Sequence, residues 1–293
     1  MSLRIYPDDD LCLLYIYKIE IMSVSSSPRI TVLMAIYNCA PTLVEALDSL
    51  MAQTYQRFKV VLCDDCSTDN TYDVARKYIE QYPDKFILIR NDTNRKLPYS
   101  LNRCLEYADT EYVARMDGDD ISKPERFEKE IEFLDSHPEY AFVSCPMEYF
   151  DENGVFMTGK AIDEPNRMTF VQDSPYAHAP VMIRTNALRD VAGYTVKPWT
   201  CRGQDVHLWA KLMNAGYKGY NIQEPLYQMR DDEAAFKRRN YREAILAVRR
   251  TYEVYRLVGI PRRYYYRIFR RLIVDSLPRI IYNYYHKRRF RKK

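Results

Sequence analysis

The stretch that decides the fold is RITVLMAIYNCAPTLVEALDSLMAQTYQRFKVVLCDD, residues 29–65. Its first eight residues, 29–36, are mostly apolar and rich in β-branched side chains, which is typical of a strand buried on both faces of a sheet. The segment LVEALDSL, 43–50, then places leucines at helical spacing, and residues 58–63 repeat the apolar strand pattern. The chain therefore opens with a strand, a helix and a second strand, the unit from which parallel sheets are built.

The same alternation continues beyond this unit. Residues 72–81 and 99–107 have helical patterns, whereas residues 86–90 and 112–116 resemble further buried strands. This order predicts a doubly wound α/β sheet, in which ligands lie at the carboxyl ends of the strands. The second half is less regular, and its pattern predicts a hairpin turn at 151–154, a short strand at 181–184 and helices at 205–215 and from 240 onward.

Two acidic clusters follow the ends of predicted strands. Asp64 and Asp65 come after the second strand, and Asp117, Asp119 and Asp120 come after the fourth. In a doubly wound sheet both clusters converge on one crevice. Carboxylates so close together repel one another unless a hard divalent cation, Mg²⁺ or Mn²⁺, offsets their charge. The alternatives are capping of the following helices and a solvated acidic turn.

The motifs of this half resemble those of a known enzyme family. AIYN (35–38), CDDCSTDNT (63–71), ARMDGDD (114–120) and GQDVHLW (203–209) are similar, in order and spacing, to the motifs of the family-2 glycosyltransferases of GT-A fold. The resemblance covers about residues 28–230. It implies an inverting transferase that uses a nucleotide-diphospho-sugar, UDP-linked, and acts on a glycan or polyisoprenoid-linked acceptor in the synthesis of bacterial surface polysaccharide or lipopolysaccharide.

The resemblance also implies roles for individual residues. The nucleotide would be bound by Tyr37, Asn38, Asp64, Asp65 and Asp117, and the Mn²⁺ or Mg²⁺ by Asp119 with Asp117. The family's catalytic base lies in a Glu-Asp pair, which here is Gln204-Asp205, so Asp205 is the predicted base and Gln204 is a departure from the family. His178, Gln204 and Arg230 are predicted to lie at the donor or acceptor cleft. A structural histidine and an ordinary salt bridge of Arg230 are the alternatives.

The chemistry of sugar transfer supports Asp205 independently. Displacement at an anomeric carbon needs a base for the acceptor hydroxyl and a stabiliser for the departing diphosphate, on opposite sides of the carbon. One acidic cluster cannot supply both. Asp205 follows a flexible loop and heads a helical segment, where the helix dipole favours its charge. A carboxylate that only begins this helix is the alternative.

The net charge of +4 on the 293 residues is distributed unevenly. Residues 237–293 hold 19 Lys and Arg against three acidic residues, a charge of +16, so the preceding 236 residues carry −12. The tail predicts a helix that lies on an anionic membrane surface, with arginines on one side and an apolar, aromatic side formed by Tyr265, Ile268, Phe269, Leu272 and Ile273. Packing of this tail on the acidic body, or oligomerisation through it, is the alternative. Nucleic acid is not an expected partner.

We therefore expect three parts in the chain. Residues 1–27 form an extension outside the fold, with Met22 as the native start. Residues 28–236 form the GT-A domain, with a nucleotide-binding half (28–120) and an acceptor half (121–236), and residues 237–293 form the basic helical tail. The seven scattered cysteines are typical of a reducing compartment, and no run reaches the length of a membrane span. The expected location is the cytoplasm, peripherally on the inner face of the cell membrane.

Two other functions fit part of the pattern. A sugar-nucleotide nucleotidyltransferase shares the sheet type and carboxylate-bound Mg²⁺, but such enzymes usually open with a Gly-rich basic phosphate loop, whereas this loop is YNCAPT (37–42). A catalytically degenerate GT-A protein that binds or assembles is favoured only by Gln204. The donor sugar, the acceptor and the linkage are left open, because they depend on the shape of the cleft.

Overall fold

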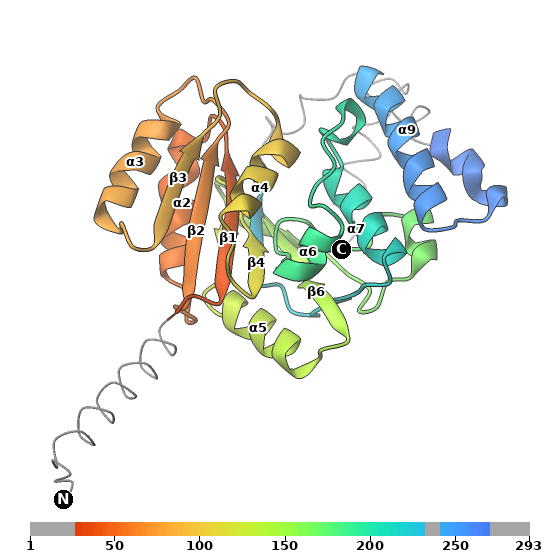
Figure 1. Cartoon of the computed structure of the whole chain (residues 1–293), viewed down its shortest axis with the longest axis horizontal. Helices are drawn as coiled ribbons and strands as arrows, with labels where there is room; N and C mark the ends of the chain where they lie inside the picture. Colours follow the sequence, from red (N-terminus) through yellow and green to blue (C-terminus); the bar gives the residue numbers. More distant parts are fainter. Residues whose placement is uncertain (1–26, 232–240, 270–293) are drawn as a thin grey trace, which may run out of the picture.

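A computed structural model describes residues 27–231 and 241–269 of the chain (Figure 1). Their centre is a seven-stranded sheet in the order β10-β6-β9-β4-β1-β2-β3. All neighbours are parallel except β9, which is antiparallel to β4 and β6. The strands are β1 (Ile30–Ile36), β2 (Phe58–Asp64), β3 (Phe86–Arg90), β4 (Tyr112–Arg115), β6 (Tyr140–Ser144), β9 (Met182–Arg184) and β10 (Lys218–Asn221). The predicted doubly wound α/β sheet is confirmed, and β9 makes it a mixed sheet.

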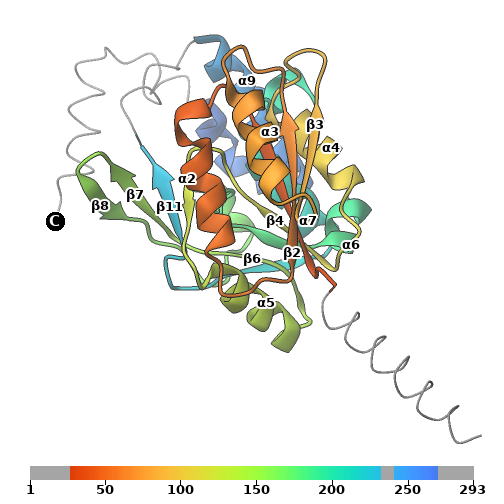
Figure 2. The same ribbon diagram turned by 90° about the vertical axis from the view of Figure 1, so that its left-hand side faces the viewer.

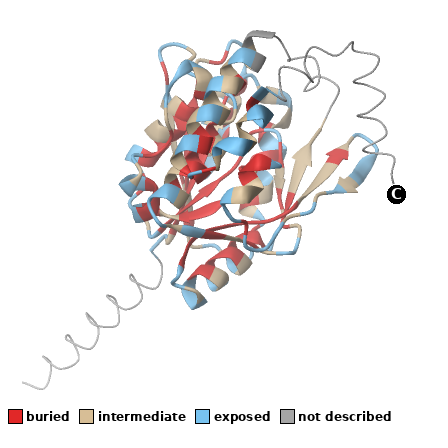
Figure 3. Ribbon diagram, turned by 90° about the vertical axis from the view of Figure 1, so that its right-hand side faces the viewer, coloured by how far each residue is buried: buried red, intermediate tan, exposed pale blue. Residues whose placement is uncertain are grey.

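Helices cover both faces of this sheet (Figures 1 and 2). One face packs against α2 (Ala40–Met51), α3 (Thr71–Gln81) and α5 (Arg126–Ser136), and the other against α4 (Leu97–Glu106), α6 (Thr185–Asp190) and α7 (Gln204–Asn214). Successive residues of a strand point to opposite faces. Val32 and Met34 of β1 accordingly join the first core cluster, and Leu33 joins the second. The buried residues gather where helices meet strands (Figure 3).

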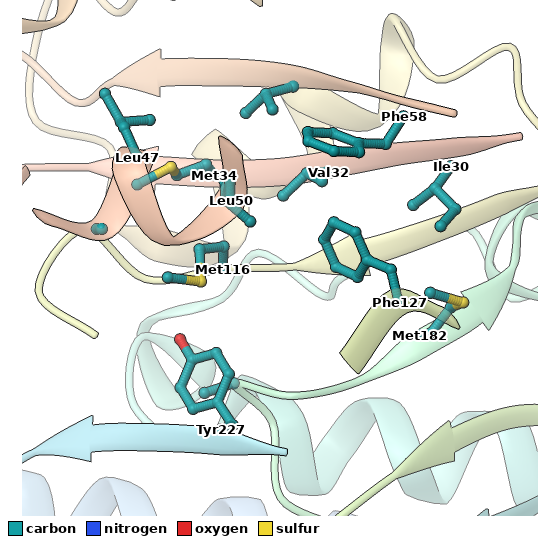
Figure 4. Packing of buried hydrophobic residues seen from close by; sticks show 14 of the residues in the cluster. Ile30, Val32, Met34, Leu47, Leu50, Phe58, Met116, Phe127, Met182 and Tyr227 are labelled. Atoms are coloured by element: carbon teal, nitrogen blue, oxygen red, sulfur yellow. The ribbon is translucent and has the colours of Figure 1, made fainter. Parts of the chain in front are cut away.

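The first core cluster fixes the strands whose ends carry the acidic residues. Val32 and Met34 lie beside Leu47 and Leu50 of α2 (Figure 4). The ring of Phe127 on α5 meets the ring of Phe58 edge-on, with 5.3 Å between centroids. Truncation of a fully buried phenylalanine such as Phe127 costs about 3–5 kcal/mol of stability. The site described below therefore lies on a rigid support.

A smaller sheet lies beside the acidic end of the large one. Its order is β5-β11-β7-β8, formed by β5 (Ile121–Ser122), β11 (Tyr227–Arg230), β7 (Met147–Asp151) and β8 (Gly154–Thr158). The predicted turn at 151–154 is confirmed as the connection of β7 and β8, which pair antiparallel. β11 pairs with β5, which directly follows the second acidic cluster. The pairing brings β11 against that cluster.

The first part of the basic tail packs on the rest of the protein. α9 (Tyr241–Leu257) lies against α7 and against the 3₁₀ turn η2 (Pro198–Thr200), and η3 (Arg262–Phe269) follows it (Figure 1). The sequence predicted Ile268 and Phe269 on one lipid-facing side, and this was wrong for Ile268. Its side chain is buried in the core cluster that contains α7, together with Val254 and Tyr255, whereas Phe269 is exposed. A further 3₁₀ turn, η1, spans Arg167–Val171.

Two predicted segments lie outside the described residues. They are the N-terminal extension up to residue 26, with the expected start at Met22, and residues 270–293 of the tail. Among the described residues, no helix combines the length and the hydrophobicity that a membrane span requires.

Candidate functional site

The carboxyl ends of β1, β2 and β4 lie side by side at one edge of the large sheet. β1 is the central strand of the three, and its residues Ile36 and Leu33 are paired with Asp64 of β2 and Arg115 of β4. The loops that leave these strands carry Tyr37, the first acidic pair and the second acidic cluster. The predicted convergence of the two clusters on one edge is therefore what the topology produces.

The loop after β1 is tied to the loop after β2 by Asn38. Its backbone N–H donates to Ser67 Oγ at 3.1 Å, and its side-chain amide accepts from the backbone N–H of Thr68 at 2.8 Å. Asn38 has a φ of 49°, a left-handed conformation that asparagine tolerates better than most residues. Tyr37, next to it, exposes 46% of its surface. Asn38 thus shapes the loop, and Tyr37 is free to stack on a ligand.

The two carboxylates of the first acidic pair differ in their accessibility. Asp64 has no exposed surface, and it pairs with Arg90 Nε at 2.9 Å and accepts from the backbone N–H of Ser67. Asp65 accepts from Asn91 Nδ2 at 2.7 Å and from the backbone N–H groups of Arg95 and Lys96 at 2.8 Å. Both are therefore bound within the protein. Of the two, only Asp65 shows any surface to a ligand.

The second acidic cluster has the arrangement that a divalent cation needs. One carboxylate oxygen from each of Asp117, Asp119 and Asp120 lies within 4.8 Å of the others. Asp120 is buried; its Oδ1 accepts from the backbone N–H of Arg230, but its Oδ2 has no partner in the described residues. Burial, and then the charges of Asp117 and Asp119, raise the pKa of Asp120 well above its ordinary value. Clustered carboxylates with an unpartnered buried oxygen fit a hard cation such as Mg²⁺ or Mn²⁺.

The glycine between Asp117 and Asp119 is required by a close approach. A Cβ at Gly118 would lie 2.7 Å from Cys39 Sγ, and the Gly118 carbonyl accepts from Thr42 Oγ1 at 2.9 Å. The acidic loop therefore lies directly on the loop after β1. The DGDD turn, residues 117–120, is therefore packed against the rest of the site. The alternative in which Asp120 caps the next helix is wrong, because Asp120 accepts a hydrogen bond from β11 and α5 begins only at Arg126.

Three residues around the acidic loop hold it in place. Tyr227 is fully buried, and its hydroxyl accepts from the backbone N–H of Asp117 at 3.2 Å. Arg230 donates from Nε to the Asp119 carbonyl at 3.0 Å and pairs through Nη2 with Glu45. The salt bridge that the sequence left open as an alternative for Arg230 is thus made with Glu45. Arg115 pairs with the Asp117 carboxylate from within the protein.

Asp205 lies at the start of α7, where the sequence placed it. The N-cap residue is Gly203, with a φ of 77°, and a Cβ there would lie 2.6 Å from Arg250 Nε. Burial raises the pKa of Asp205, while the first backbone amides of α7, Arg250 and Arg115 act in the opposite direction. A carboxylate with a raised pKa, at a helix N-terminus and beside a cavity, is suited to accept a proton.

His178 and Gln204 form one buried group beside Asp205. His178 Nε2 lies 3.0 Å from the Tyr194 hydroxyl, and its Nδ1 lies 3.5 Å from Gln204 Nε2. Burial lowers the pKa of His178 well below its ordinary value, and Arg115 lowers it further, so the ring is neutral. His178 is not part of the carboxylate group that fits a cation. His178 lies in the segment that precedes β9, and its contact with Gln204 links that segment to the first turn of α7.

A cavity of about 540 Å³ joins these groups. It is lined by Asp117 of the acidic loop, by His178, Gln204 and Asp205, and by Arg115. Its remaining wall comes from the second half of the chain and includes Tyr149, Lys160, Ile162, Tyr176 and Met229. This volume lies within the usual range of ligand pockets. Asp117 and Asp205, which the sequence placed 88 residues apart, thus line one cavity.

The sequence motifs did not identify Arg115, Tyr194 or Tyr227 as parts of the site. Arg115 was present in the motif ARMDGDD, but a strand-end arginine has no signal that reveals its burial. Tyr227 lies three residues before Arg230, which was predicted at the cleft, so its place near the site had a signal, whereas its bond to the acidic loop depends on the β5–β11 pairing.

Comparison with known proteins gives one consistent result. The profile described as Glycosyl transferase family 2 matches residues 31–194. EpsE of Bacillus subtilis, whose name describes a glycosyltransferase, is 39% identical over 265 residues, covering 90% of this chain and 95% of EpsE. An Escherichia coli protein is 28% identical over 281 residues, which cover 91% of this chain and 98% of the E. coli protein. Its name is UDP-Gal:alpha-D-GlcNAc-diphosphoundecaprenol beta-1,3-galactosyltransferase.

The fold is similar to that of solved glycosyltransferases. The mannosyltransferase PcManGT from Pyrobaculum calidifontis, solved in complex with GDP-Man and Mn²⁺, superimposes with a TM-score of 0.61 at 21% sequence identity. The superposition covers 86% of this chain and 70% of that protein.

Proposed function

The chain belongs to glycosyl transferase family 2, and we propose that it transfers a sugar from a UDP-sugar to a hydroxyl of a glycan or polyisoprenoid-linked acceptor, with inversion. The setting is the synthesis of a surface polysaccharide. The observation that carries the proposal is the single cavity lined by Asp117 and Asp205, because it brings a cation-binding loop and a candidate base to the same space. The E. coli relative, whose name specifies UDP-Gal and a lipid-linked GlcNAc acceptor, supports both substrate classes.

The acidic loop is the proposed binding place of a divalent cation. Asp119 is exposed and is the principal ligand in this proposal, with Asp117 beside it and the unpartnered oxygen of Asp120 within reach. A cation bound there would supply charge stabilisation for the leaving nucleoside diphosphate. The Mn²⁺ in the PcManGT complex supports this proposal.

The nucleotide is proposed to lie on the loops after β1 and β2. Tyr37 offers an exposed ring for stacking, and Asp65 offers a carboxylate that accepts hydrogen bonds, as the imide N–H of uracil requires. Asn38 and Asp64 have a positioning role in this proposal, because their side chains bond within the two loops. Asp117 is placed to accept a hydrogen bond from a ribose or sugar hydroxyl.

Asp205 is the proposed base. It accepts the proton of the acceptor hydroxyl while the hydroxyl oxygen forms a bond to the anomeric carbon. The bond from that carbon to the diphosphate oxygen breaks, and the electron pair leaves with the nucleoside diphosphate. Gln204 replaces the family's glutamate, and its amide lies against His178. The substitution therefore falls on a group that positions the helix start.

The acceptor is proposed to enter through the part of the cavity formed by the second half of the chain. Tyr149, Ile162 and Met229 supply apolar and aromatic surface, on which sugar rings stack, and Lys160 supplies a positive charge. A sugar attached to a diphosphate fits this combination of an aromatic wall and a cation.

The exposed side of the tail is proposed to contact an anionic membrane surface. Tyr266 and Phe269 of η3 are exposed, and Arg262 and Arg263 precede them. Aromatic rings and cations together are typical of interfacial segments. Because Ile268 is buried, truncation after Phe269 leaves the packed part intact. Flotation with phosphatidylglycerol vesicles tests the proposal. The parent should float at low salt, the protein truncated after Phe269 should float less because it loses the basic residues 270–293, and the truncated protein with Tyr266→Ser and Phe269→Ser should not float. Equal flotation of the three proteins contradicts the proposal.

Nucleotide release from a panel of UDP-sugars with Mn²⁺ tests the transferase assignment. The parent should release UDP slowly from one donor and faster when a lipid-diphosphate-linked sugar is added. Asp119→Asn should abolish both rates. A protein that binds no donor, or an Asp119→Asn variant that releases UDP as the parent does, contradicts the assignment.

A further inference from the structure

Arg115 is a buried cation among the carboxylates of the site. It is the last residue of β4, and its backbone N–H donates to the Val181 carbonyl at 2.9 Å, so the strand fixes its position. The side chain is 5% exposed and lines the cavity. A buried guanidinium must be paired, because an isolated charge is costly away from water.

Its pairing is confined to one carboxylate. Nη2 of Arg115 donates to Asp117 Oδ1, and Nε has no hydrogen-bond partner in the described residues. The guanidinium of an arginine stays charged in proteins, so this buried group keeps its positive charge. The residue therefore has spare hydrogen-bonding capacity that the fold does not satisfy. A group kept at this cost has a use at the site.

The Arg115–Asp117 pair lies where the acidic loop serves both the proposed cation site and the cavity. Asp117, Asp119 and Asp120 are close enough to share one cation, yet Asp117 also lines the cavity with Asp205. If all three carboxylates turned to the cation, the cavity would lose the hydrogen-bond acceptor that the acidic loop supplies. Arg115 contacts Asp117 alone among the three.

We propose that Arg115 is a positioning residue that holds the Asp117 carboxylate towards the cavity and away from the cation. Asp119 is then the principal ligand of the cation, and Asp117 orients the donor. This inference rests on the proposed function for the meaning of the cavity. Its test does not depend on catalysis, because the affinity for Mn²⁺ alone reports how many carboxylates reach the cation.

The experiment measures free Mn²⁺ by electron paramagnetic resonance during titration of the full-length protein without nucleotide. Arg115→Met should bind Mn²⁺ on the order of tenfold more tightly, because a positive charge is lost and Asp117 is released towards the cation. Arg115→Lys keeps the charge and should bind within about threefold of the parent. Arg184→Met is the matched control, since Arg184 ends the neighbouring β9 and bonds Tyr140 and Leu134 carbonyls. Its Mn²⁺ affinity should equal that of the parent.

A double-mutant cycle with Asp117→Asn isolates the positioning effect. If Arg115 acts by holding Asp117, Arg115→Met should change the Mn²⁺ affinity by less than about threefold in the Asp117→Asn background. An equal tightening in both backgrounds shows an effect of charge through space and overturns the proposal. So does an unchanged affinity of folded Arg115→Met. If the Met variant does not fold, Arg115→Gln takes its place with the same expectations.

Turnover separates failure of this inference from failure of the proposed function. With a donor that the parent uses, Arg115→Met should lower kcat about a hundredfold while Mn²⁺ binds more tightly. A parent that binds Mn²⁺ but uses no donor refutes the proposed function, and the Mn²⁺ cycle still decides the role of Arg115.

Discussion

Replacing Tyr227 by phenylalanine removes one hydroxyl from the support of the acidic loop. The ring is fully buried, and the guanidinium of Arg126 lies 5.2 Å from its centroid. The hydroxyl accepts from the backbone N–H of Asp117 at 3.2 Å. Phenylalanine keeps the ring and its packing, so the substitution changes only the bond to the loop.

The magnitude follows from the group that is left without a partner. A partly buried backbone N–H that loses its acceptor costs about 1–3 kcal/mol. Because Asp117 is only partly buried, water can replace part of the lost hydrogen bond. We therefore expect the free energy of unfolding to fall by about 1–2 kcal/mol, near the lower end of that range. For a protein of this size the melting temperature should fall by roughly 3–6 °C. Because the lost bond holds Asp117, Mn²⁺-dependent donor turnover should fall at least about tenfold.

Tyr112→Phe is the matched control for this substitution. Tyr112 is equally buried, and its hydroxyl donates to Asp135 at 2.7 Å at the opposite end of β4. It should lower the melting temperature similarly without affecting turnover at temperatures where the protein is folded. Thermal unfolding and steady-state UDP release measure the two effects. Equal turnover of Tyr227→Phe and Tyr112→Phe, at equal folded fractions, would refute the reasoning.

Three further predictions concern charged groups of the site and the core. Asp205→Asn should lower kcat about 10²–10⁴-fold with unchanged UDP affinity. In the parent, the raised pKa of Asp205 should place the acid limb of the pH profile of kcat above the usual range of aspartate pKa values, because the base must lose its proton before it can act. Glu130 is fully buried beside Arg126, and burial raises its pKa to about 7. The folded state therefore binds this proton more tightly than the unfolded state does. The free energy of unfolding should fall by up to roughly 3 kcal/mol as the pH rises from about 4.5 to about 7, and urea unfolding of Glu130→Gln should lack this pH dependence. Asp65→Asn should weaken UDP binding and lower stability by about 1–3 kcal/mol, because two backbone N–H groups lose a charged acceptor; unaltered UDP affinity in a calorimetric titration would contradict its place at the nucleotide.

The first half of the fold could be predicted because its signals are local. β1, β2 and β3 are apolar runs bounded by loop residues, and the structure places their ends within a residue or two of the prediction. β6, β10 and β11 had no comparable signal. β10 contains Gly219, whose missing Cβ admits the ring of Phe142 from the neighbouring strand, a requirement that only the packed sheet shows.

The site divides in the same way. Asp117 and Asp119 follow a predicted strand, so topology alone brought them to the strand-end edge, whereas Asp205 was predicted at the start of a helix. The hydrogen-bond partners in the acidic loop come from residues distant in the sequence. Arg230, for example, donates to the Asp120 carboxylate and to the Asp119 carbonyl. Periodicity in the tail predicted one apolar side, but Ile268 packs inward and Phe269 points outward. Helical spacing shows which residues share a face, and only packing shows which face is covered.

Asp119 and Asp205 have separate tasks in the proposed reaction: Asp119 lies on the acidic loop, and Asp205 lines the cavity together with Asp117 of that loop. The most direct test is the rate of UDP release from the preferred UDP-sugar, measured with bound donor quantified in parallel, for the parent, Asp119→Asn and Asp205→Asn. Asp205→Asn should bind the donor with Mn²⁺ as the parent does and release about 1% or less of the UDP, whereas Asp119→Asn should lose Mn²⁺-dependent binding itself. Parental turnover by Asp205→Asn, or parental donor binding by Asp119→Asn, would contradict this separation of tasks.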